Sequence, residues 1–325
     1  MTAEFELIRK YFHRAAPSAV LGVGDDCALV QPRQGLALAI STDMLLEGRH
    51  FLPDTDPRRL GRKSLAVNLS DLAAMGADPR WATLALALPD AREAWVESFA
   101  GGLFEMAREY GVDLIGGDTT RGPRTVSITI IGELPAHLAL RRDGARDGDD
   151  VWLSGSTGDA ALGLACLMHD GATRAARLDA AARAHCIARL EDPTPRVALG
   201  VRLRGIAHSA IDVSDGLLAD LLHILEASHV GADLFWEALP RSAAMAGCAD
   251  AALAKDCLLA GGDDYELVFT APPFRRAEVE AIAREVRLPL ARIGVIVPGR
   301  ARLTVRAADG GRIDAPRHGF DHFGT

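Results

Sequence analysis

The chain has 325 residues, 49% of them hydrophobic and 25% charged, and its 44 acidic residues outnumber its 36 basic ones to give a formal net charge of −8. A chain of this length exceeds what one hydrophobic core usually organises, so we expect two domains. The acidic balance argues against a nucleic-acid or membrane partner, and a phosphate ligand would need cations to mediate its binding.

The cysteines and the apolar segments indicate a cytoplasmic protein. The five cysteines form no C-x-x-C pair, so neither a zinc site nor a disulfide framework is indicated. The first 12 residues contain acids and lack an apolar signal core, and the most apolar stretch, residues 81–89, is far shorter than a membrane span.

The first predicted elements are a strand and a helix. Residues 36–41 (LALAIS) form a short apolar run that ends at a polar cluster, as a buried strand would. Asp56 and Pro57 fit a helix N-cap and first helical residue, and this helix should reach about Gly76. A polar stripe at i, i+4 and i+7 interrupts one face of the helix: Ser64, Asn68 and Asp71.

A second helix and two further strands follow. Apolar residues at helical spacing over 95–106 predict the helix, and Gly111 is placed to end it. Residues 112–115 should form a strand that leads into GGDTTRGP. Residues 125–134 alternate apolar and polar side chains, which predicts a half-buried strand.

The charged, glycine-rich segment 141–150 is the best candidate for a domain junction. We therefore place an N-terminal domain at 1–148 and a C-terminal domain at 149–325, both mixing α and β structure. In the second domain, residues 151–155 resemble a strand, and residues 209–228 resemble a strand, a polar turn and a leucine-rich helix.

Carboxylates gather at the predicted strand ends and glycine turns, where α/β folds build their sites. Any one of them is explained by the preference of Asp and Gly for turns. Asp71 is different, because Asp is a poor helix former and no turn explains it inside the predicted helix. The carboxylates in question are Asp25, Asp26, Asp43, Asp71, Asp118, Asp212, Asp215, Asp263 and Asp264.

Converging carboxylates would need a counterion, because two unit charges about 4 Å apart repel by about 4 kcal/mol at an effective dielectric near 20. Lys and Arg are scarce beside these motifs, whereas Mg²⁺ prefers oxygen ligands and keeps water for substrate phosphates. The sequence contains no P-loop and no protein-kinase H-R-D or D-F-G set, so a bound nucleotide would be held in another way.

Other chemistry has less support. Cys27 has acidic neighbours that would raise the pKa of its thiol, which favours packing over nucleophilic catalysis. SGSTGD, before a predicted helix, could present backbone N–H groups to an anion, but such turns are commoner as plain connections. His50 could reach a substrate or be structural.

Six motifs in order over essentially the whole chain resemble the bacterial thiamine-monophosphate kinase family: STDMLLEGRHF, AVNLSDLAAMGADP, LIGGDTTRGP, AIDVSDGLLADL, GGDDYELVFT and GFDHF. This family belongs to the aminoimidazole ribonucleotide synthetase-like superfamily of ATP users without a P-loop. The resemblance implies ATP-dependent phosphorylation of thiamine monophosphate to thiamine diphosphate with several Mg²⁺ ions. It also implies a homodimer whose N-terminal domains pair into an intersubunit β-barrel.

Matching motif by motif assigns roles to individual residues. The implied metal ligands are Asp26, Ser41, Thr42, Asp43, Asp71, Asp118, Asp212 and Asp215, and among them Asp43, Asp71, Asp118 and Asp212 are the implied catalytic groups. The implied nucleotide contacts are Tyr110, Gly117, Asp118, Arg142 and Ser214. The implied contacts with the thiamine part are His50, Asp263 and Phe320.

Two of these positions depart from part of the family. Some members have Glu where this chain has Asp263, and a hydrogen-bonding aromatic residue where it has Phe320. The first change shortens the carboxylate arm, and the second keeps the ring without its polar group, so the seating of the substrate could differ.

The acceptor would be a phosphate monoester, largely deprotonated at neutral pH because its second pKa is near 6. We therefore expect no general base and no phosphoenzyme, only charge neutralisation and in-line positioning. Three alternatives remain: a different substrate within the superfamily, such as selenide or a carbamoylated protein tail; a non-catalytic Mg-nucleotide sensor; and a metal-dependent phosphohydrolase.

Overall fold

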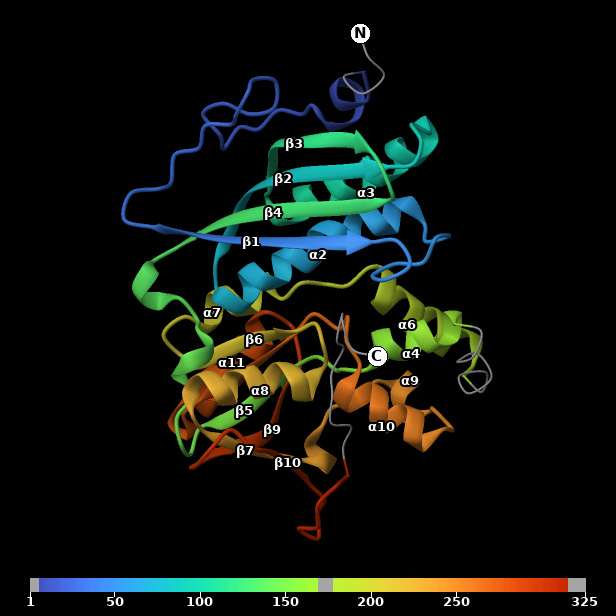
Figure 1. Cartoon of the computed structure of the whole chain (residues 1–325). Helices are drawn as coiled ribbons and strands as arrows, with labels where there is room; N and C mark the ends of the chain where they lie inside the picture. The colour runs from blue at the N-terminus through green and yellow to red at the C-terminus, as the bar shows by residue number, and fades with distance from the viewer. Residues whose placement is uncertain (1–5, 169–177, 315–325) are drawn as a thin grey trace. The chain divides into compact units, whose positions relative to one another are not determined.

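The protein forms two compact units in a computed structural model that describes residues 6–168 and 178–314. The N-terminal unit comprises Met1–Leu72 and Ala77–His137, and the C-terminal unit comprises Ala73–Gly76 and Leu138–Thr325. Each unit has one sheet and its own helices (Figure 1). No helix in the described ranges is both long and apolar enough to cross a membrane.

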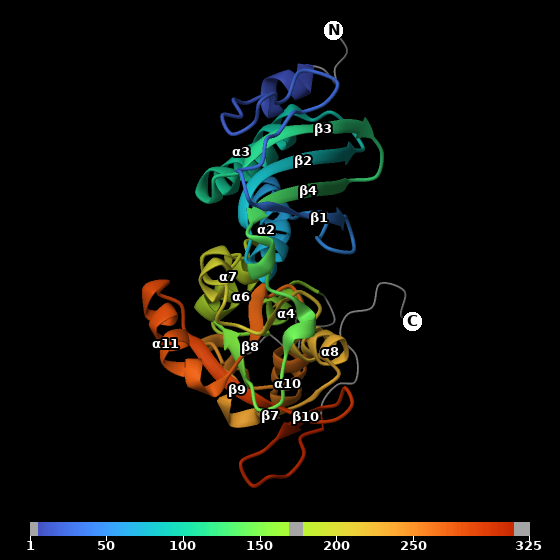
Figure 2. The ribbon, with the colours of Figure 1, turned by 90° about the vertical axis from the view of Figure 1, so that its left-hand side faces the viewer.

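The N-terminal unit is a four-stranded sheet with the strand order β1-β4-β2-β3. Its elements are β1 (Ala37–Leu46), α2 (Pro57–Met75), β2 (Asp78–Leu88), α3 (Glu93–Tyr110), β3 (Asp113–Arg121) and β4 (Thr125–Leu134), after a π-helix, η1 (Ile8–Phe12). The pairs β1–β4 and β2–β4 are antiparallel, and β2–β3 is parallel. Helices α2 and α3 lie along the same face of this sheet (Figure 2).

The predicted features of both helices are confirmed. The Asp56 carboxylate accepts a hydrogen bond from the Arg59 N–H at 3.0 Å, as an N-cap does. Gly111 ends α3 in the left-handed conformation, with φ of 65°. On β4, the predicted alternation places Ile128 and Ile130 in the core.

The predicted strands 36–41 and 112–115 are too short, because β1 runs on to Leu46 and β3 to Arg121. The polar motifs STD and GGD therefore lie inside strands and not in turns after them. The reason is that β1 pairs with β4 along its entire length, so the backbone is satisfied whatever side chains the strand carries. The face that the helices leave open accepts polar side chains such as that of Thr42. Ser41 and Asp43 lie on the helix side, where the Ser41 hydroxyl bonds to Asp71 of α2.

The C-terminal unit has a six-stranded sheet with the order β10-β7-β9-β5-β8-β6. Its strands are β5 (Asp150–Ser154), β6 (Ser209–Val213), β7 (Gly231–Phe235), β8 (Glu266–Ala271), β9 (Leu290–Val297) and β10 (Leu303–Arg306). Its α-helices are α4 (Asp159–Leu167), α6 (Ala180–Glu191), α7 (Val197–Leu203), α8 (Leu217–Ser228), α9 (Ala243–Ala246), α10 (Ala251–Ala260) and α11 (Arg276–Glu285). The predicted strand, turn and helix at 209–228 are β6, its loop and α8, whose leucines pack into the main core.

Helices α2 and α3 cross at two glycines. A Cβ on Gly102 would lie 1.8 Å from the Arg58 carbonyl oxygen, and one on Gly61 would lie 2.1 Å from the Phe99 carbonyl oxygen. The backbones are therefore in direct contact, and this crossing fixes α2, which carries the polar stripe, against α3.

We predict that Gly102→Ala lowers the free energy of unfolding by at least about 1–3 kcal/mol, because the added methyl group has no space at the crossing. Gly101, the next residue on α3, has no atom within 4 Å of its ideal Cβ and provides a matched control. Gly101→Ala should stabilise the protein by roughly 0.5–1 kcal/mol through helix propensity. Urea unfolding of both variants is the measurement, and equal effects would contradict the close crossing.

Candidate active site

The polar stripe of α2 meets the edge strand β1. The Ser41 hydroxyl donates a short hydrogen bond to the Asp71 carboxylate, and the Asn68 side-chain oxygen accepts from the Asp43 N–H at 3.2 Å. The Asn68 amide is itself oriented, because its nitrogen donates to the Ser64 carbonyl at 2.9 Å. The structure thus brings together three predicted metal ligands, Ser41, Asp43 and Asp71.

Asp43 is strongly perturbed by this environment. Burial raises the pKa of its carboxyl group to about 7, and the nearby negative charge of Asp71 adds to the effect. A cation bound to the two carboxylates would offset both effects. The donors present are all oxygen atoms, which fits a hard ion such as Mg²⁺.

In the described part of the chain, no three His, Cys, Asp or Glu side chains are grouped as a metal site. This does not conflict with Mg²⁺ chemistry, because Mg²⁺ usually takes one or two protein carboxylates and completes its shell with water and substrate phosphates. The residues at β1 and α2 therefore fit the ion, and the individual ligands stay a prediction.

Two other predicted ligands lie on the opposite face of the sheet. Thr42 is opposite Thr129, with 2.8 Å between their hydroxyl oxygens, whereas Asp43 is opposite the buried Ile128 on the helix side. Thr129 is in turn opposite Thr83 of β2. Two residues further along β2, Ala85 is opposite Asp118 of β3. Side chains alternate between the faces along a strand, so Thr42 and Asp118 share the face that the helices leave open.

Position 117, a predicted nucleotide contact, has space only for a glycine. Its φ is 151°, and a Cβ there would lie 1.9 Å from the Leu84 carbonyl oxygen. A small pocket opens beside it. The pocket is lined by Ile8, Phe12, Val23, Leu84, Leu114 and the segment from Gly116 to Thr119. Gly117 and Asp118 thus border a small recess lined mainly by apolar side chains.

The remaining predicted residues of this unit lie on other segments: His50, Asp26 and Tyr110. His50 follows β1, and its Nδ1 accepts a hydrogen bond from the Leu46 N–H at 3.0 Å, which leaves Nε2 as the protonated nitrogen of the neutral ring. The buried Lys63 donates to the His50 carbonyl at 3.3 Å. Asp26 is exposed in the loop before β1, and Tyr110 is half-buried at the end of α3.

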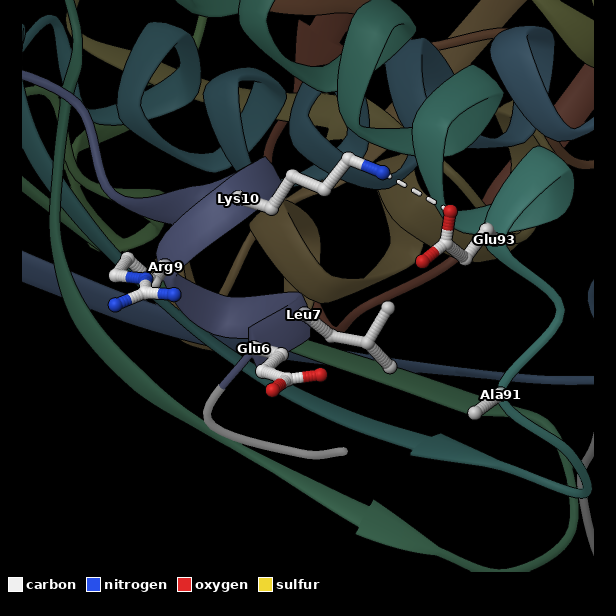
Figure 3. Close-up of a pocket in the computed structure, with 6 residues that line it drawn as sticks. All are labelled: Glu6, Leu7, Arg9, Lys10, Ala91 and Glu93. Atoms are coloured by element: carbon white, nitrogen blue, oxygen red, sulfur yellow. Dashed lines mark hydrogen bonds and ion pairs between the residues drawn. The ribbon is translucent and has the colours of Figure 1, made fainter. Parts of the chain in front are cut away.

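A second depression of this unit lies beside η1 and is drawn in Figure 3. Its lining residues are Glu6, Leu7, Arg9, Lys10, Ala91 and Glu93. The Lys10 ammonium pairs with the Glu93 carboxylate at 2.9 Å across it. It includes none of the predicted site residues, so we assign it no part in the site.

In the C-terminal unit, the loop between β6 and α8 is held by one buried carboxylate. The backbone N–H groups of Ser214, Asp215 and Gly216 all donate to Oδ2 of Asp220, at 3.0, 3.0 and 3.1 Å. Burial raises the pKa of Asp220 to about 7. Ser214 and Asp215, the predicted nucleotide and metal contacts, are therefore presented by a fixed loop.

The GGDDYE turn packs on this loop, and its two aspartates have different environments. The Asp263 N–H donates to the Ser214 carbonyl at 2.8 Å. Asp264 is fully buried and accepts from the N–H groups of Gly158 at 2.6 Å and Ala160 at 3.4 Å. Asp264 is therefore structural, and it already occupies one backbone donor of SGSTGD, the Gly158 N–H, that could have bound an external anion.

Three predicted site residues remain: Asp212, Arg142 and Phe320. Asp212 lies on β6 and is 5% exposed. Arg142 is exposed, and its carbonyl oxygen accepts a hydrogen bond from the Ser228 hydroxyl at 2.8 Å, which fixes the backbone that carries its guanidinium. Phe320 lies outside the described residues.

Two family models match the chain: AIR synthase related protein, N-terminal domain, over residues 24–134, and AIR synthase related protein, C-terminal domain, over residues 146–306. The chain is 46% identical to thiamine-monophosphate kinase of Escherichia coli K12, over 99% of this chain and 98% of that protein. The chain belongs to the thiamine-monophosphate kinase family. The predicted resemblance is therefore confirmed.

Solved structures of thiamine-monophosphate kinases have the same fold. The enzyme from Stenotrophomonas maltophilia K279a is 46% identical, with a TM-score of 0.84 over 95% of this chain and 96% of that chain. The structure of AaThiL complexed with AMPPCP and TMP is 31% identical, with a TM-score of 0.77 over 98% and 96% of the two chains. The mixed α/β, two-domain fold expected from the resemblance is confirmed.

Sequence reasoning missed two residues that bond to predicted site residues: Asp220 accepts from the β6–α8 loop, and the Tyr265 hydroxyl donates to Asp263. The only sequence signal for Asp220 was an aspartate in the first turn of a helix, five residues after Asp215. Tyr265 gave no signal at all. Its role depends on contacts that exist only after folding.

We predict that Asp43→Asn stabilises the metal-free protein at pH 8. The folded-state pKa of about 7 exceeds the ordinary value of 3.8, so the folded protein binds this proton more tightly. The free energy of unfolding therefore falls as the pH rises from about 4 to 7, and the amide removes that loss. The expected gain is about 1–3 kcal/mol at pH 8, since one pKa unit corresponds to about 1.4 kcal/mol.

Thermal unfolding at pH 4 and pH 8 in EDTA tests this, and the gain should nearly vanish at pH 4. Asp90→Asn is the control, because Arg92 lowers the pKa of that exposed carboxyl group and its amide should give no gain at pH 8. A destabilised Asp43→Asn variant at pH 8 would contradict the assignment of Asp43 as a strained, cation-seeking carboxylate.

Proposed function

We propose that this protein transfers the γ-phosphoryl group of ATP to the phosphate of thiamine monophosphate, which yields thiamine diphosphate and ADP, the last step of thiamine diphosphate biosynthesis. The observation that carries the proposal is the 46% identity to thiamine-monophosphate kinase over nearly the whole of both chains. The half-buried pair of Asp43 and Asp71 supports it, since a phosphoryl-transfer site needs ligands for a divalent cation.

The reaction needs charge control more than proton transfer. One bond breaks between the γ-phosphorus and the bridging oxygen of ADP, and one forms to an oxygen of the acceptor phosphate. That oxygen is deprotonated at neutral pH, so no residue has to act as a base. Bound Mg²⁺ supplies positive charge that neutralises the phosphate oxygens.

The protein's residues hold the reactants in line. In this proposal Asp43, Asp71 and Asp118 bind cations on the N-terminal unit, and Asp212 and Asp215 bind them on the C-terminal unit. The remaining cation ligands are Asp26, Ser41 and Thr42. Tyr110, Gly117, Arg142 and Ser214 contact the nucleotide, while His50, Asp263 and Phe320 contact the thiamine part.

We further propose a homodimer in which the N-terminal sheets of two copies pair into a β-barrel. The open face of β1 supports this, because Ile40 and Met44 are 62% and 54% exposed there, beside the exposed Leu38 and Leu46. Apolar side chains in a row on an edge strand are typical of a surface that a partner covers. A cytoplasmic location agrees with the five cysteines, which are all free thiols.

The decisive assay is incubation with ATP, Mg²⁺ and thiamine monophosphate, with the products followed by mass. Thiamine diphosphate should form in a 1:1 ratio with ADP. Asp43→Ala and Asp71→Ala should lower kcat by about 100-fold or more, because the charge stabilisation of the transition state is lost. The exposed Asp90→Asn variant should retain activity. ADP release without thiamine monophosphate would favour a phosphohydrolase, and binding without turnover would favour a sensor.

The dimer is tested with Ile40→Glu, which places a charge in the proposed interface and should leave the fold intact because Ile40 is exposed. Sedimentation should find the wild type as a dimer and this variant as a monomer. Phe274→Glu is the control, since Phe274 is a 79% exposed apolar residue of the C-terminal unit. A monomeric wild type at micromolar concentration would refute the homodimer.

A further inference from the structure

The turn that carries Asp263 has an unusual backbone. Asp263 and Tyr265 have φ values of 65° and 52°, so two non-glycine residues adopt the left-handed conformation within three positions. This conformation is unfavourable for a residue with a Cβ, and it is rare for a bulky residue. Strain of this kind persists only where surrounding contacts hold it, and it gathers at functional sites.

Backbone contacts to the neighbouring loop hold the turn. The N–H groups of Asp263 and Tyr265 donate to the carbonyls of Ser214 and Val213, each at 2.8 Å. A Cβ on Gly262 would lie 2.4 Å from the Ser214 carbonyl oxygen, so the two segments are as close as backbones allow. The turn and the β6–α8 loop therefore form one body.

Contacts of Asp264 also hold the turn. The carboxylate of the buried Asp264 holds it to the start of α4, as described above. The Asp264 carbonyl accepts from Arg189 at 3.0 Å, and the same guanidinium reaches the buried Glu266 at 3.2 Å. Asp263, in contrast, is half-buried.

The orientation of the Asp263 carboxylate depends on Tyr265. The Tyr265 hydroxyl donates to Asp263 Oδ1 at 3.0 Å, and Tyr265 is only 8% exposed. An aspartate side chain on a turn otherwise rotates between staggered positions. A hydrogen bond from a buried ring favours one of them, and bonds to charged acceptors are the stronger kind.

We propose that Tyr265 is a positioning residue for the phosphoryl acceptor. Its hydroxyl fixes the Asp263 carboxylate against the thiamine part of the substrate. The shared hydrogen bonds of the turn and the β6–α8 loop keep that carboxylate in register with Ser214 and Asp215, which serve the nucleotide and its cations. This inference rests on the proposed function, because it needs Asp263 to contact the acceptor.

The test is Tyr265→Phe, which removes one oxygen atom and leaves the ring. The KM for thiamine monophosphate should rise about 5- to 20-fold, because the hydrogen bond that orients the acceptor contact is lost, while the KM for ATP and kcat stay within about 2-fold. Tyr11→Phe is the matched control. Its hydroxyl also donates to a carboxylate, that of Glu93, at 3.4 Å, and its loss should change neither KM.

A double-mutant cycle separates positioning from general stability. In an Asp263→Ala background, Tyr265→Phe should raise the KM for thiamine monophosphate by less than 2-fold, because no acceptor oxygen is left for the hydroxyl to orient. An unchanged KM in Tyr265→Phe, or independent effects of the two substitutions, would overturn the inference. Equal losses in both KM values and kcat would show a structural role instead.

Failure of the proposed function gives a different result. A wild-type protein that forms no thiamine diphosphate would refute the function and this inference together. A wild-type protein that forms the product, with a Tyr265→Phe variant that matches it, would refute only the role of Tyr265.

Discussion

The repulsion between Asp43 and Asp71 is the constraint on which the site depends. The fold packs α2 against β1, so these carboxylates are partly withdrawn from water and brought close to each other. The Ser41 hydroxyl satisfies one oxygen but supplies no charge. The protein therefore keeps an electrostatic conflict in its folded state, at a cost in stability that a bound cation would remove.

Three buried carboxylates outside this pair are stabilised by hydrogen-bond donors or cations of the chain itself. Asp220 and Asp264 accept backbone N–H groups, and Glu266 is paired with Arg189 and Arg196. A negative neighbour raises the pKa of Asp43 as it does that of Asp220, where the neighbour is Asp215. The difference between them is therefore the three backbone N–H groups that Asp220 accepts, and not a charged neighbour.

The sequence predicted what depends on local periodicity and failed where tertiary contacts decide. The two helices and the caps at Asp56 and Gly111 followed from spacing and end signals. The strands β1 and β3 were predicted too short, because polar residues were taken as strand ends although pairing continued through them. Site residues came from motif resemblance. Tyr265 was missed because only the folded turn brings its hydroxyl to Asp263.

Strand alternation connects the proposed dimer to the proposed ligands. Ile40, Thr42 and Met44 are every second residue of β1, so they share one face. The register from Thr42 through Thr129 to β2 places Asp118 on that face as well. A partner that covers the apolar part of this face would therefore also change the solvation of two proposed cation ligands. Dimerisation and metal binding would then be coupled through one side of one sheet, while Asp43 and Asp71 act from the other.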